Sequence, residues 1–127
     1  MMNVLRQSLD GSGESTFVVS RTRAEPDDKV HDVAARTLRE LNETLTDFYL
    51  ESTQMLTVDG YPAIELFYQF KNDNHVIYQR QTLILIDTVE AGKKLVAYVA
   101  TCPDEFTLHH QQQYQDIIQG IKFHRGK

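Results

Sequence analysis

The chain has 127 residues, which matches one domain large enough to bury a core. Its 13 basic and 18 acidic residues give a net charge of -5, and no cluster of Lys and Arg forms the electrostatic footprint that nucleic-acid binding requires. No stretch reaches the roughly 20 apolar residues of a membrane span, and a single cysteine, Cys102, permits no internal disulfide. We therefore expect a cytoplasmic globular protein that binds no nucleic acid and does not insert into a membrane.

The N-terminal part of the chain, residues 4–23, predicts a hairpin. Residues 4–9 form a short strand candidate, and residues 10–13 supply the glycines of a turn. Residues 15–23 follow as a run rich in β-branched side chains, which favour strands. The two runs are expected to pair with each other.

A helix is predicted next, opening at Pro26, Asp27 and Asp28, because proline suits a first helical turn and acids complement the positive helix end. Apolar residues then recur at spacings of three and four. They are Val30, Val33, Ala34, Leu38, Leu41 and Leu45. The helix should therefore bury one stripe.

Four consecutive strands are predicted after this helix. Residues 48–58 form the first, and Asp59 and Gly60 favour a two-residue type I′ turn that requires positive φ at both positions. That loop length predicts three pairs of opposed residues: Val58 with Tyr61, Leu56 with Ala63, and Met55 with Ile64. Further turns at residues 72–74 and 90–93 separate strands at residues 75–87 and 94–101, so the four form an antiparallel meander.

The chain closes with a predicted helix. Pro103 ends the last strand, Thr107 caps a helix that extends to Gln119, and Gly120 stops it. Its expected apolar contacts are Leu108, Tyr114, Ile117, Ile118 and Ile121.

The element order β-β-α-β-β-β-β-α contains no regular strand–helix alternation, so it favours an α+β fold with an antiparallel sheet of about six strands. We expect the two helices to pack mainly on one face of the sheet. The strands near the middle of the chain are nevertheless apolar on both faces, because Phe67 interrupts the alternation and residues 83–86 are all apolar. A second apolar face needs a cover, and a partner molecule, a second copy or the far ends of the helices are the alternatives.

No catalytic or metal-binding constellation is present in the sequence. His109 and His110 are adjacent, so on a helix they point about 100° apart and do not hold one metal together. No HExxH motif, paired CxxC motif or nucleophile elbow occurs. We expect a protein that is not an enzyme and that carries no cofactor and no metal.

Two glutamines have two possible roles. Gln79 and Gln81 fall on the same face of one predicted strand. A carboxamide can both donate and accept, so these side chains suit a bound polypeptide on an apolar surface. The alternative is that this part of the strand lies at a solvent-exposed edge and glutamine is merely soluble there.

Several segments of the chain resemble the DcrB-like superfamily. They are Gly60-Tyr61-Pro62-Ala63, Tyr68-Gln69-Phe70-Lys71-Asn72, Tyr78-Gln79-Arg80-Gln81, the strand ending in Pro103, and the final helix introduced by Phe106-Thr107. Within this superfamily the chain is most similar to the Eag-type effector-associated adaptors of bacterial type VI secretion. The resemblance implies a PsbP-like α+β fold and a homodimer. It further implies a chaperone whose sheet holds the N-terminal transmembrane helices of an effector and helps to load that effector on a VgrG spike.

The same resemblance implies the residues of the binding groove. Gln79 and Gln81 would be its polar residues, and Val18, Ile77 and Leu83 its apolar lining. Family members have a further N-terminal segment that ends in a glycine–tryptophan turn, and we expect this chain, which has no tryptophan, to lack it and to form one DcrB-like domain over residues 1–127. The alternative function is a non-catalytic dimeric binding or scaffold module of the PsbP-like class with another partner.

Overall fold

The structure is a computed structural model that describes residues 2–5, 15–88 and 92–123, the first of these ranges as backbone alone. Its elements are β1 (Met2–Leu5), β2 (Thr16–Arg23), α1 (Val30–Thr44), β3 (Thr46–Val58), β4 (Tyr61–Asn72), β5 (His75–Thr88), β6 (Gly92–Pro103) and α2 (Leu108–Gln119). Both the α+β class and the order β-β-α-β-β-β-β-α are therefore confirmed.

One antiparallel sheet contains all six strands in the spatial order β1-β2-β6-β5-β4-β3. The consecutive strands β3 to β6 form the predicted meander, and the β1–β2 hairpin is added beside β6. Part of the expected first strand (residues 6–9), the turn at residues 10–13 and two residues of the third turn, Glu90 and Ala91, lie outside the described residues. Strand β3 forms one edge of the sheet, so among the described strands one side of its backbone has no partner.

The turn between β3 and β4 sets the register as predicted. Asp59 and Gly60 have φ of 50° and 85°, the left-handed values that a type I′ turn needs and that glycine adopts without a steric penalty. Val58 then lies opposite Tyr61, and Met55 lies opposite Ile64. Leu56 faces Ala63, which completes the three predicted pairs.

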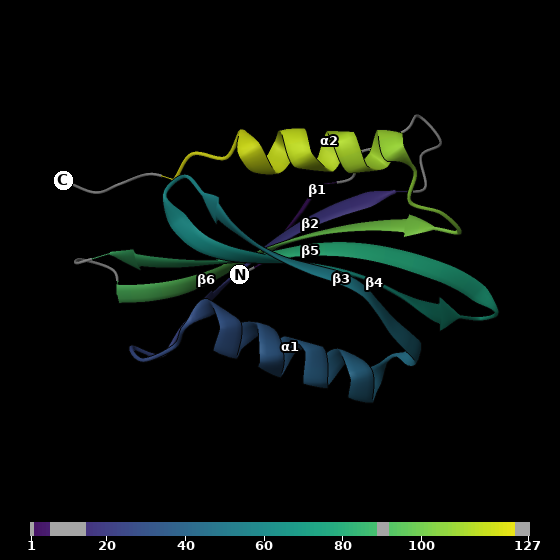
Figure 1. Cartoon of the computed structure of the whole chain (residues 1–127), viewed down its shortest axis with the longest axis horizontal. Coiled ribbons are helices and arrows are strands. Elements are labelled where there is room, and N and C mark those ends of the chain that lie inside the picture. The colour runs from purple at the N-terminus through teal and green to yellow at the C-terminus, as the bar shows by residue number, and fades with distance from the viewer. Residues whose placement is uncertain (1, 6–14, 89–91, 124–127) are drawn as a thin grey trace.

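The two helices lie on opposite faces of the sheet (Figure 1). Helix α1 packs on a core that contains Leu66, Tyr68 and Leu83, whereas α2 packs on a core that contains Phe17 and Ile84. This placement corrects the expectation that both helices pack mainly on one face. The physical reason is the two-sided apolar character of β4 and β5, because each apolar face needs its own cover.

Helix α1 begins four residues later than Pro26, the predicted opening, because the acidic segment before it forms a separate turn. The Asp28 carboxylate accepts a hydrogen bond from the Glu25 backbone N–H at 3.0 Å, and it pairs with Arg36 on the helix at 3.1 Å. The Lys93 ammonium of β6 donates to the Pro26 and Asp28 carbonyls at 2.8 and 2.9 Å. These contacts hold the start of α1 against the end of β6.

Helix α2 has the predicted boundaries. The Thr107 side chain accepts from the His110 backbone N–H at 3.2 Å, the His110 ring accepts from the Thr107 backbone N–H at 3.1 Å, and Gly120 follows the last turn. Tyr114 and Ile118 are buried as expected. Leu108 is 85% exposed, so its expected apolar contact is wrong: the buried stripe of α2 is His110, Tyr114 and Ile118, and Leu108 lies on the opposite side of the helix from His110.

Candidate functional site

Helix α1 leaves part of its face of the sheet uncovered. Among the described residues its main contacts are with β3, β4 and β5, and Leu95 and Ala97 of β6 pack at the margin of the core beneath it. On the same face, β2 and the C-terminal half of β6 lie beyond these main contacts. We define the open strip as the half-buried side chains that lie there, together with one neighbour from β5. These are Thr16, Val18, Ser20, Ala97, Val99, Thr101 and Gln79. Most of these side chains are small, so this part of the sheet surface lies lower than the neighbouring helix α1.

The strand register brings all five sequence-predicted groove residues to this face. Val18 lies opposite Val99 of β6, which in turn lies opposite Gln81 of β5. Alternate residues along β5 share that face, so Ile77, Gln79 and Leu83 join them. The five groove residues on this face are thus Val18, Ile77, Gln79, Gln81 and Leu83. The register thus answers which side of the sheet these residues occupy, a point that the sequence left open.

The five residues differ in the exposed fraction of their side chains. Val18, Ile77 and Gln79 are half-buried and accessible to another molecule. Gln81 is 9% exposed and lies at the margin of the open strip. Leu83 is 1% exposed because it belongs to the core under α1, so its side chain packs against the helix and does not line the strip.

A hydrogen-bond chain crosses three strands at the edge of the open strip. The Tyr68 hydroxyl donates to Gln79 Oε1 at 2.6 Å, and Gln81 Nε2 donates to the same hydroxyl at 3.0 Å. Gln79 Nε2 donates to Thr101 Oγ1 at 3.0 Å. Burial raises the pKa of Tyr68 to about 12, so this phenol keeps its proton at neutral pH. The two amides are therefore held in fixed orientations by a buried hydroxyl.

Sequence reasoning missed Tyr68 and Thr101 as members of this site. Tyr68 follows Ile64 and Leu66 at alternate positions, a pattern that indicates a core residue and gives no sign of a role for its hydroxyl. Thr101 became a neighbour of Gln79 only through the β5–β6 register. The available signal was the polar atom on each of these otherwise core-like residues, since buried hydroxyls need partners.

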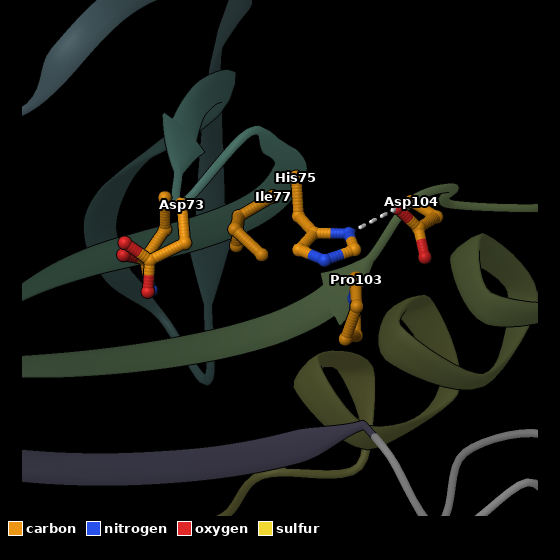
Figure 2. A pocket seen from close by; sticks show the side chains of 6 residues that line it. Asp73, His75, Ile77, Pro103 and Asp104 are labelled. Atoms are coloured by element: carbon orange, nitrogen blue, oxygen red, sulfur yellow. Dashed lines mark ion pairs between the residues drawn. The ribbon is translucent and has the colours of Figure 1, made fainter.

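A pocket of about 430 Å³ lies at the end of the same face, where the β4–β5 turn meets the end of β6 (Figure 2). Its lining residues are Asn72, Asp73, His75, Ile77, Pro103 and Asp104. The His75 ring and the Asp104 carboxylate lie 3.7 Å apart, and both side chains are exposed. Ile77 belongs to the pocket and to the predicted groove, so the pocket continues the exposed surface past Thr101 and Gln79.

Within residues 15–88 and 92–123, no group of three or more His, Cys, Asp and Glu side chains is placed to hold a metal ion. Neither α1 nor α2 is long and apolar enough to cross a membrane. Cys102 is buried in the core under α2, where the Ser15 hydroxyl lies 3.3 Å from its sulfur.

Comparison with known proteins identifies the family and the fold. The DcrB family profile matches residues 1–120. No curated protein matches the chain. Two of the solved structures that share its architecture illustrate the fold. The first is the protein of unknown function PA94 from Pseudomonas aeruginosa, with a TM-score of 0.78 and 22% identity over 99% of this chain and 85% of that one.

The second is LpqN of Mycobacterium tuberculosis, described as involved in cell envelope biogenesis, with a TM-score of 0.66 and 14% identity over 93% of this chain and 75% of that one. At these identities the likeness to both structures is one of fold. The family match extends from the first residue to one residue past the end of α2, and it therefore includes all the described strands, both helices and the open strip. The chain belongs to the DcrB family.

Proposed function

We propose that this protein is a chaperone that shelters an apolar helix of a partner protein on the open strip. The observation that carries the proposal is the half-buried surface of β2 and β6 beside α1, where Val18, Ala97 and Val99 lie among small polar side chains. Small side chains such as Ala97, Ser20 and Val99 support it, because small residues let a helix backbone approach closely. Covering such a surface removes apolar area from water on both partners.

The proposed occupant is an N-terminal transmembrane helix of a type VI secretion effector, as in the Eag-type adaptors that the chain resembles. Such a helix exposes apolar side chains along its length before secretion, and it therefore needs a temporary cover in an aqueous compartment. We accordingly propose a cytoplasmic location and an indirect role in loading the effector on its VgrG spike. No catalysis and no cofactor enter this proposal.

Val18 offers a sharp test because its side chain is half-buried and lies within the open strip. The tagged protein is co-expressed with a neighbouring gene product that begins with apolar helices, and the soluble partner recovered with it is quantified. Val18→Glu should reduce recovery about tenfold or more, since an unpaired carboxylate would be placed against an apolar helix. Val76→Glu is the matched control, because Val76 is also half-buried but lies on the opposite face of β5.

Recovery that falls in Val18→Glu and persists in Val76→Glu supports the proposal. Equal recovery with both variants contradicts it, and so does a wild-type protein that keeps no such partner soluble. Thermal unfolding of both variants separates a binding defect from a loss of fold.

A second copy of the chain is the other proposed partner, and β3 is the surface that favours it. This edge strand has 13 residues, and its pairing with β4 is regular from Ser52 to Val58, a stretch without charged residues or proline. Long uncharged edges are templates for pairing with another strand. Met55 is 59% exposed there, and Met55→Lys should shift the protein towards the monomer in analytical ultracentrifugation. A scaffold module of the alternative kind would keep this dimer but would not recover an apolar-helix partner.

A further inference from the structure

Tyr68 stands out within the candidate site because its side chain is fully buried while its hydroxyl reaches two glutamines. Its exposed fraction is 0%, and its neighbours on this face belong to the core under α1. A phenylalanine would fill this core without a hydroxyl, whereas the Tyr68 hydroxyl donates to one amide and accepts from the other. The hydroxyl therefore connects the core to the open strip.

The chain of hydrogen bonds has a fixed direction. A phenol has one proton, and the Tyr68 proton goes to Gln79 Oε1 at 2.6 Å, so its oxygen is left to accept from Gln81 Nε2. With its carbonyl engaged, Gln79 turns its Nε2 towards Thr101 Oγ1. The Tyr68 hydroxyl thus determines how the amides of Gln79 and Gln81 are oriented, and therefore which of their atoms remain free to contact a bound molecule.

Two polar groups, one hydrogen-bond donor and one acceptor, are available to a bound molecule. Thr101 accepts from Gln79, so its own hydroxyl proton has no acceptor among the described residues. Gln81 Oε1 likewise has no donor within the described part of the chain. One group donates and the other accepts, and they lie on neighbouring strands beside Val99 and Val18. A hydroxyl or a carboxamide, which can both donate and accept, is the side chain that complements them.

We propose that Tyr68 is a positioning residue that makes the open strip selective for an apolar helix carrying one hydroxyl or carboxamide side chain, in preference to a wholly apolar helix. This inference rests on the proposed function, because it concerns the choice among apolar helices. A wholly apolar helix would cover the Thr101 and Gln81 groups without pairing them. Leaving a buried polar group unpaired weakens association about tenfold.

The test uses apolar helices of about 20 residues, each fused to the same soluble carrier. One member has alanine throughout its central turn, and the others have a single serine at each successive position of that turn. The chain contains no tryptophan, so one tryptophan in the helix reports binding by its fluorescence. The quantity measured is the ratio of the affinity for the best serine helix to the affinity for the alanine helix.

The wild-type ratio should be about ten, and Tyr68→Phe should reduce it to about two or less, because the freed amides no longer keep a fixed orientation. Thr101→Val should also reduce it, through loss of the donor itself. Tyr114→Phe is the control: it removes the hydroxyl of another fully buried tyrosine, on the opposite face, and should leave the ratio unchanged.

A wild-type protein that binds the alanine helix as tightly as every serine helix overturns this inference and leaves the proposed function standing. So does a Tyr68→Phe variant that keeps the full preference. If the wild-type protein binds none of the helices, the proposed function fails and the inference fails with it.

Discussion

Arg80 and Glu65 form an ion pair beneath α2, and each side chain is only 9% exposed. The Arg80 guanidinium also lies over the Phe67 ring, 4.2 Å from its centroid, and 5.2 Å from the centroid of Phe106. The aromatic faces attract the cation, while Glu65 neutralises its charge. The pair thus connects β4 and β5 to the segment that leads into α2.

Glu65→Gln should lower the free energy of unfolding by about 3–5 kcal/mol, because it leaves the Arg80 charge buried without a counter-charge. Urea denaturation monitored by circular dichroism measures the change. The double variant Glu65→Leu with Arg80→Met removes both charges, so it should be considerably more stable than Glu65→Gln. A double variant as unstable as Glu65→Gln would show that the unpaired Arg80 charge is not the cause of the destabilisation.

Tyr114→Phe should lower the free energy of unfolding by about 1–3 kcal/mol. The Tyr114 hydroxyl donates to the Tyr98 carbonyl at 3.1 Å and lies 2.5 Å from Thr82 Oγ1, so it links α2 to β6 and β5. Its loss removes both of these buried contacts. Thermal unfolding checks the effect, and Tyr49→Phe on the exposed part of β3 is the matched control that should change stability little. Equal melting temperatures for the two variants would contradict this role.

Local rules predicted much of the fold from sequence, because turns and caps depend on neighbouring residues. Asp59 and Gly60 determined a register that holds throughout the C-terminal half of β3, and Thr107 marked the start of α2. The placement of the helices depends on contacts between distant segments, which periodicity does not encode. The apolar residues on both sides of β4 and β5 did indicate that each face needs a cover.

The candidate site was predictable only in part for the same reason. Alternation placed Gln79 and Gln81 on one face, and the family resemblance added Val18. Their connection through Tyr68 depends on the β4–β5 register, which brings Tyr68 opposite Gln79. The sequence left that register open because the parity of the turn at residues 72–74 was not determined.

Thr107→Ala should destabilise the protein by about 1 kcal/mol, because it removes the side-chain oxygen that accepts from the His110 backbone N–H. Thr107→Ser keeps that oxygen and should remain close to the wild type. The measurement is the midpoint of chemical denaturation. Identical losses in both variants would assign the effect to packing of the threonine methyl group and not to the cap.

Asp28 provides a stability contribution that depends on pH. The hydrogen bond from Arg36 holds the pKa of the Asp28 carboxyl below its usual value, with a further contribution from the Glu25 backbone N–H. The unfolded chain therefore binds a proton at Asp28 more readily than the folded one. The contribution to stability is present above the unfolded pKa of about 3.9 and is lost as the pH falls through the lower folded pKa.

Asp28→Asn should accordingly be less stable than the wild type at pH 7, and the difference should shrink as the pH falls below about 4. Urea denaturation of both proteins across this range measures it. Asp27→Asn is the matched control, since this exposed neighbour forms none of the contacts that join Asp28 to Arg36, and it should alter stability little at any pH. A wild-type advantage that stayed constant down to pH 2 would mean that the Asp28 charge does not stabilise the start of α1.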